Sequence, residues 1–185
     1  MGGIGARMGS PKQLLLLHGR SLAARVADVL AGHASPVVVL GAGALPRDLP
    51  SLPAIPDVPG IRGPVAGLVA ALRWLPGATW LFCPCDHPSL SGEALVWLLA
   101  QRRPGVWAVL PRSRPDQLEP LLALYEPEAL TLIEDATAQG NAPRSLAGHP
   151  HVASPLVPPA LRPAWVDVNT REDAAALGLV RPDDG

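Results

Sequence analysis

The sequence predicts an α/β fold with a mostly parallel sheet, and three observations carry this prediction. Short apolar runs of strand length alternate with segments of helical periodicity, which is the order of a parallel sheet with helical crossovers. The β-branched run at residues 37–39 is typical of a strand buried on both faces. The 18 Gly and 23 Pro residues stand between these segments, as turn residues do. For 185 residues we expect one domain over residues 1–185, with a frayed end at 181–185.

The first 110 residues show the clearest alternation of strands and helices. Ser21 precedes apolar residues at helical spacing, and we expect it to cap a helix at 22–31. Pro64 suits the first turn of a second helix, which continues through residue 72. A third helix is expected at 92–101. The strands expected in this half lie at 37–40, 54–56, 79–83 and 106–110.

The second half is less regular. We expect one strand at 118–125, a helix at 127–139 and a last strand at 164–168. Thr170 begins a final helix that reaches residue 177, because a Thr followed by acidic residues is a typical helix start. The single tyrosine, Tyr125, is expected in the core with its hydroxyl hydrogen-bonded.

The glycine-rich start of the chain predicts a loop that binds phosphate groups. Its glycines are Gly2, Gly3, Gly5 and Gly9. Glycines let successive amide groups converge on an anion, and Arg7 and Lys12 add positive charge. Lys12 is the only lysine among 15 basic residues, and an ammonium on a flexible stem is suited to reaching phosphate oxygens. The alternative is an ordinary surface loop.

Two common glycine motifs do not fit this stretch. The pattern G-x-x-x-x-G-K-S/T fails because Gln13 follows Lys12, and G-x-G-x-x-G from Gly3 meets Met8 at its last position. The second failure disfavours a dinucleotide-dependent dehydrogenase.

Asp86 follows an expected buried strand, and ligands of parallel α/β sheets bind at the carboxyl ends of strands. A carboxylate that faces a triphosphate needs Mg²⁺ between them, because the like charges otherwise repel. The alternative is an Asp that only caps the next turn. Cys83, Cys85 and His87 alternate nearby, but no fourth ligand for zinc is evident.

Composition excludes several classes of function. A net charge of −1 gives no reason to expect nucleic acid or an anionic membrane as a partner. No run approaches 18 apolar residues, and the two cysteines are too close for an ordinary structural disulfide. We therefore expect a cytoplasmic protein.

Three motifs resemble the MobA-like nucleotidyltransferases, which include molybdenum cofactor guanylyltransferases, cytidylyltransferases and sugar-nucleotide pyrophosphorylases. Residues 2–12 resemble the G-G-x-[SGA]-x-R-M-G-x-x-K signature of that family, and residues 84–88 resemble its P-C-D-x-P. Residues 167–173 resemble the late N-x-N-T-P-E-D or D-x-D-T-P-E-D motif, with Arg171 in place of the proline. The resemblance implies a three-layer α/β/α, Rossmann-like nucleotidyltransferase fold.

The resemblance also implies the site residues. It gives catalytic roles to Arg7, Lys12 and Asp86. It assigns the nucleotide to Gly2, Gly3, Gly5, Gly9, Lys12, Asp57, Gly63, Gly67 and Asp86. The Mg²⁺ ligands that it implies are Asp86, Asp167 and Asn169, of which the last two would alternate along the expected strand at 164–168. From the sequence alone, Asp57 is equally well explained as a turn residue.

The reaction that the resemblance implies is transfer of GMP from GTP to the phosphate of molybdopterin, with release of pyrophosphate. Asp167 and Asn169 mix the two variants of the late motif, so a cytidylyltransferase or a sugar-phosphate nucleotidyltransferase is an alternative. An inactive nucleotide-binding relative is another. The acceptor is expected to contact the loops 112–117 and 141–157, which the sequence does not interpret further.

The start of the chain departs from the family pattern. Family members carry an apolar strand ahead of the glycine loop, whereas here Met1 directly precedes Gly2. The resemblance therefore implies that the first strand, normally central in the sheet, is missing. A start codon assigned too late or a truncated protein would explain this.

Overall fold

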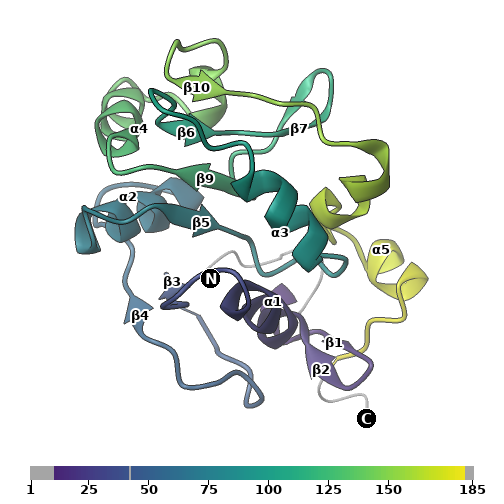
Figure 1. The fold of residues 1–185 in the computed structure, drawn as a ribbon. Coiled ribbons are helices and arrows are strands. Elements are labelled where there is room, and N and C mark those ends of the chain that lie inside the picture. Colours follow the sequence, from purple (N-terminus) through teal and green to yellow (C-terminus); the bar gives the residue numbers. More distant parts are fainter. Residues whose placement is uncertain (1–10, 42, 182–185) are drawn as a thin grey trace.

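The computed structural model describes residues 11–41 and 43–181 (Figure 1). Its helices are α1 (Leu22–Ala31), α2 (Pro64–Trp74), α3 (Gly92–Leu99), α4 (Ala129–Ala138) and α5 (Arg171–Ala176), with 3₁₀ segments η1 (Lys12–Leu14), η2 (Pro143–Leu146) and η3 (Pro159–Trp165). Its strands are β1 (Leu16–Leu17), β2 (Arg20–Ser21), β3 (Val39–Leu40), β4 (Ala54–Ile55), β5 (Trp80–Phe82), β6 (Ala108–Val109), β7 (Arg112–Arg114), β8 (Gln117–Leu118), β9 (Ala123–Tyr125) and β10 (Val152–Ala153). None of these helices is long and apolar enough to cross a membrane.

The central sheet has the order β10-β6-β9-β5. β10 pairs parallel with β6, while β9 pairs antiparallel with both β6 and β5. Three of the four strands therefore run in one direction, which confirms the predicted α/β class and the mostly parallel sheet. β9 is reversed because a hairpin, β7–β8, and not a crossover helix, connects it to β6.

Helices cover both faces of this sheet, which gives the predicted three layers (Figure 1). β9 shows the division residue by residue. Ala123 and Tyr125 pack in one core cluster with residues of α2 and α4, whereas Leu124 packs in another with residues of α1, α3 and η3. The Tyr125 hydroxyl donates to Pro120 O at 2.6 Å, as expected for a buried tyrosine.

Two expected strands are wrong. Residues 118–125 form no single strand, because the chain leaves the β7–β8 hairpin after Leu118 and joins the central sheet only at Ala123. Residues 164–168 form no strand either. Residues 164 and 165 belong to the 3₁₀ segment η3, which has Pro159 in its first turn and Pro163 inside it.

β3 and β4 form a separate parallel pair. Within the described ranges, no strand joins β3 to β5. The candidate site described below lies between β3 and β5.

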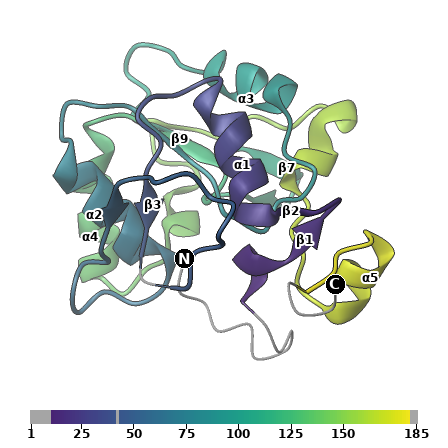
Figure 2. The ribbon, with the colours of Figure 1, turned by 90° about the horizontal axis from the view of Figure 1, so that it is seen from below.

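Segments near the two ends of the described chain lie side by side. Leu16 and Val180 form an antiparallel bridge, so the β1–β2 hairpin lies beside α5 (Figure 2). A small third core, which includes Leu17, Leu22 and Val168, holds these segments together. This packing brings Lys12 close to the residues just before α5.

Candidate functional site

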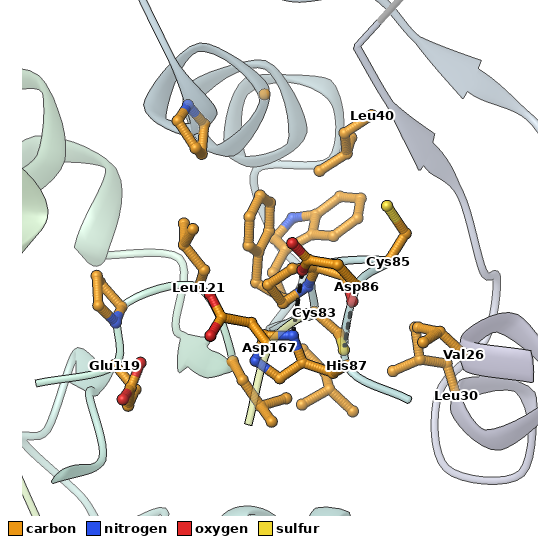
Figure 3. Close-up of a pocket in the computed structure, with 18 of the residues that line it drawn as sticks. Val26, Leu30, Leu40, Cys83, Cys85, Asp86, His87, Glu119, Leu121 and Asp167 are labelled. Carbon is orange, nitrogen blue, oxygen red and sulfur yellow. Dashed lines mark hydrogen bonds and ion pairs between the residues drawn. The ribbon is translucent and has the colours of Figure 1, made fainter. Parts of the chain in front are cut away.

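A cavity of about 1380 Å³ lies between β3 and β5 and opens along the carboxyl end of β5 (Figure 3). Every predicted site residue in the described ranges lines it, namely Lys12, Asp57, Gly63, Gly67, Asp86, Asp167 and Asn169. The remaining predicted residues, Gly2, Gly3, Gly5, Arg7 and Gly9, lie outside the described residues. The fold thus brings residues from separate parts of the chain to one cavity.

Lys12 is the centre of the polar part of this cavity. Its ammonium Nζ lies 2.8 Å from Asp86 Oδ2 and 2.8 Å from Asn169 Oδ1. Lys12 begins η1, Asp86 follows β5, and Asn169 precedes the cap of α5. The two oxygens therefore face one position, which the Lys12 ammonium occupies.

Hydrogen bonds of the main chain fix this arrangement. Val168 N donates to Asp86 O at 3.1 Å, which ties the segment before α5 to the end of β5. The side chain of Asp173 accepts from the amides of both Asn169 and Thr170, at 3.0 and 2.8 Å. Thr170 Oγ1 in turn accepts from Asp173 N, which completes the predicted cap of α5.

Asp167 and Asn169 reach the cavity without the strand that was expected to carry them. They flank Val168, which is fully buried, while both polar residues are exposed. The extended backbone after η3 gives the same alternation that a strand would give. Asp167 and Asp86 line the same cavity (Figure 3).

Asp86 is ionised in this environment. Burial by itself would raise the pKa of its carboxyl group, but hydrogen bonds from His87 and Lys12, together with the charge of Lys12, lower the pKa to about 2. The site therefore presents a carboxylate at any pH near neutrality.

Asp57 and Gly67 lie against each other on the opposite wall of the cavity. A Cβ atom at Gly67 would lie 3.2 Å from Asp57 Oδ1 and 3.2 Å from Leu40 Cβ. The absence of a side chain at Gly67 therefore lets α2 approach both β3 and the Asp57 carboxylate. Gly63 caps α2 with φ +74°, a conformation that favours glycine.

The cysteines next to Asp86 remain protonated thiols. Burial raises the pKa of Cys83 well above its usual range and raises the pKa of Cys85 to about 11. Over residues 11–41 and 43–181, no group of three or more His, Cys, Asp or Glu side chains is arranged to hold a metal.

Two polar pairs, each with at least one member that lines the cavity, were not predicted from the sequence. His87 Nδ1 lies 3.3 Å from Asp86 Oδ1, and Ser113 Oγ donates to Glu119 Oε1 at 2.5 Å. Burial raises the pKa of Glu119, although the Ser113 bond opposes this. For His87, the sequence offers only its position next to Asp86 as a sign of this contact. For the Ser113–Glu119 pair, the sequence offers no sign of the hydrogen bond.

Comparison with known proteins gives consistent matches. The family model for the MobA-like NTP transferase domain matches residues 1–153. Proteins named probable molybdenum cofactor guanylyltransferase, from Bacillus cereus (strain AH820) and Bacillus thuringiensis (strain Al Hakam), are 30% identical over 129 residues. These matches cover 67% of this chain and 64% of each relative.

Solved structures share the fold at lower identity. Molybdopterin-guanine dinucleotide biosynthesis protein A from Archaeoglobus fulgidus superposes with a TM-score of 0.69 at 24% identity, covering 95% of this chain and 93% of that one. Rv0371c from Mycobacterium tuberculosis gives the same TM-score and coverage at 20% identity. The family model, the relatives and the shared fold lead to one conclusion: this chain belongs to the MobA-like NTP transferase family.

Proposed function

We propose that this protein is a nucleotidyltransferase that transfers GMP from GTP to the phosphate of molybdopterin and releases pyrophosphate. The observation that carries the proposal is the Lys12 ammonium, held 2.8 Å from both Asp86 Oδ2 and Asn169 Oδ1 in a large cavity. Family membership and the names of the Bacillus relatives support the choice of reaction and of substrates.

In this proposal Lys12 binds the triphosphate. Its side chain lines the cavity and is one-fifth exposed, so a phosphate oxygen can reach the ammonium. An ammonium is a compact charge with three donors, which suits several phosphate oxygens at once. The amides of the glycine-rich start and the Arg7 guanidinium are proposed to add to this charge neutralisation.

The donor set at Lys12 fits Mg²⁺. Asp86 and Asn169 offer a carboxylate and an amide oxygen, which are ligands that Mg²⁺ accepts, and both oxygens already contact one cationic group. Asp167 adds a second carboxylate at the same cavity. When bound, Mg²⁺ would neutralise phosphate charge and help to align the triphosphate.

The proposed reaction needs positioning more than covalent help. An oxygen of the acceptor phosphate attacks the α-phosphorus of GTP, the bond from that phosphorus to the bridging oxygen breaks, and pyrophosphate leaves with the electron pair. Lys12 and Arg7 stabilise the charge that develops on the leaving group. Asp57, Gly63 and Gly67 are proposed to hold the guanosine on the α2 side of the cavity.

Turnover with defined nucleotides tests the proposal. Pyrophosphate release would be measured with Mg²⁺, molybdopterin and each of GTP, CTP and ATP, for wild type, Lys12→Ala and Asp86→Ala. Arg73→Ala is the matched control, because Arg73 pairs with Glu134 on the surface of α2 and α4, away from the cavity. The proposal requires GTP-dependent release that both site variants lose and the control keeps.

Other outcomes separate the alternatives. Preference for CTP would replace guanylyl by cytidylyl transfer. Release that needs a sugar phosphate in place of molybdopterin would identify a sugar-phosphate nucleotidyltransferase. Equally low release by wild type and both site variants would leave an inactive nucleotide-binding protein.

A further inference from the structure

His87 is one of the few polar residues that the described part of the chain buries; the others are Gln13, Ser21 and Ser113. A buried polar group is costly unless it has a hydrogen-bond partner. The side chain of His87 is only 7% exposed, and its Nδ1 lies 3.3 Å from Asp86 Oδ1. The Nδ1 atom of the buried imidazole therefore has the carboxylate at the centre of the site as its partner.

The two oxygens of the Asp86 carboxylate have different partners. Oδ1 faces His87, and Oδ2 faces Lys12. An ionised carboxylate only accepts hydrogen bonds, so His87 Nδ1 carries the proton and donates it to Oδ1. The hydrogen bond from His87 therefore occupies Oδ1 and leaves Oδ2 to the Lys12 ammonium.

The main chain holds both side chains of this pair. Val168 N donates to Asp86 O at 3.1 Å, and Leu90 N donates to His87 O at 3.2 Å. Pro88 follows directly and is buried. The terminal torsion of an aspartate is soft, so a fixed backbone alone does not orient the carboxylate. A donor on Oδ1 does, because rotation of the carboxylate would break that hydrogen bond.

We propose that His87 is a positioning residue, which orients the Asp86 carboxylate so that Oδ2 is turned toward the cation site shared with Asn169. This inference rests on the proposed function, since it concerns the Mg²⁺ that Asp86 would bind. His87 touches neither the nucleotide nor the metal in this scheme. Its hydrogen bond acts on the metal through the aspartate, as outer partners of metal ligands do.

Metal affinity tests the proposal without relying on turnover. Mn²⁺ would be titrated into the protein with GTP and followed by electron paramagnetic resonance. His87→Leu, which removes the donor, should lower Mn²⁺ affinity by about 10- to 100-fold, the usual effect of losing an outer partner of a metal ligand. His87→Asn, whose amide Nδ2 lies close to the position of the imidazole Nδ1, should recover most of the loss.

The controls separate positioning from a structural role. GTP affinity in EDTA should stay the same in both variants if His87 acts on the metal site alone. The thermal midpoint should fall in His87→Leu, because the Asp86 carboxylate loses one of the hydrogen bonds that stabilise it, and should recover in His87→Asn. Wild-type affinity in His87→Leu would overturn the proposal. So would an affinity in His87→Asn as low as that of His87→Leu when both are folded.

A second measurement needs no variant. Nitrogen-15 NMR of wild type should find the proton on His87 Nδ1 at neutral pH, and a ring protonated only at Nε2 would overturn the proposal. If wild-type protein bound no Mn²⁺ with any nucleoside triphosphate, the proposed function would fail instead. The failure of each idea is thus recognised separately.

Discussion

Lys12 and Asp86 form an ion pair across 74 residues of sequence, with 2.8 Å between Nζ and Oδ2. The same ammonium contacts Asn169 from a third segment. Since these oxygens are also the proposed metal ligands, Lys12 stands where a cation would bind. The residue that is proposed to hold the triphosphate is therefore also a competitor for the metal ligands.

Removal of the Lys12 ammonium should weaken GTP binding. Hydrogen bonds to charged groups contribute about 1.5–3 kcal/mol, so Lys12→Met should lower GTP affinity by roughly 10- to 100-fold. Isothermal titration calorimetry with Mg²⁺ present measures this. Arg73→Ala should bind GTP like wild type, and an unchanged affinity in Lys12→Met would remove Lys12 from the triphosphate site.

The same variant should bind a metal more tightly when no nucleotide is present. In wild type the metal has to displace the ammonium from Asp86 and Asn169, whereas in Lys12→Met both oxygens are free of it. We expect roughly tenfold higher affinity for Mn²⁺ alone, measured by electron paramagnetic resonance, because one charge-assisted contact no longer has to be broken. Weaker Mn²⁺ binding in the variant would contradict the competition.

Asp86 should contribute to stability in a pH-dependent way. Its pKa in the folded protein is about 2, below the ordinary aspartate value of 3.8, because hydrogen bonds from His87 and Lys12 outweigh burial. A depressed pKa stabilises the fold above the unfolded value and loses that contribution as the pH falls toward the folded value. The contribution is about 2 kcal/mol at neutral pH.

Urea unfolding of wild type and Asp86→Asn at several pH values measures this contribution. The difference in free energy of unfolding should be constant from pH 7 to 5 and should shrink between about pH 4 and pH 2. A difference that stayed constant over the whole range would mean that the carboxylate is not stabilised in the folded protein.

Gly67→Ala should destabilise the protein and weaken nucleotide binding. The added Cβ would lie 3.2 Å from both Leu40 Cβ and Asp57 Oδ1, so β3 or the carboxylate has to move. Overpacking costs about 1–3 kcal/mol, and the better helix propensity of alanine returns up to about 1 kcal/mol. We expect a net loss of about 1 kcal/mol in urea unfolding.

Gly77→Ala is the matched control for this change. A Cβ at Gly77 meets nothing within 4 Å, so stability should be unchanged or slightly higher. If Gly67→Ala were as stable as this control and bound GTP equally well, the close approach of α2 to Asp57 would have no functional meaning.

The sequence predicted the fold best where local signals act alone. Ser21 and Thr170 accept from the amides three residues on, and α1 begins and ends at the expected residues. The strand expected at 118–125 failed because an apolar run does not reveal that its two ends join different sheets. The strand expected at 164–168 failed because prolines in η3 override its apolar pattern.

The candidate site was found through motifs. Lys12 follows the glycine-rich start, Asp86 follows a buried strand at the edge where ligands of α/β sheets bind, and the family resemblance added Asn169. His87 was not predictable as a partner of Asp86, because its burial depends on packing between segments far apart in the sequence. Gly2, Gly3, Gly5, Arg7 and Gly9 remain predictions, since they lie outside the described residues.

The hydrogen bond from Val168 to Asp86 has a consequence for where the functional unit of this chain ends. The family model ends at residue 153, yet Asp167 and Asn169 lie beyond that boundary and are tied to the end of β5 by this bond. A graft or fusion that ends at residue 153 would include Asp86 and would lack Asp167 and Asn169. The transplantable unit of this chain must therefore extend through α5.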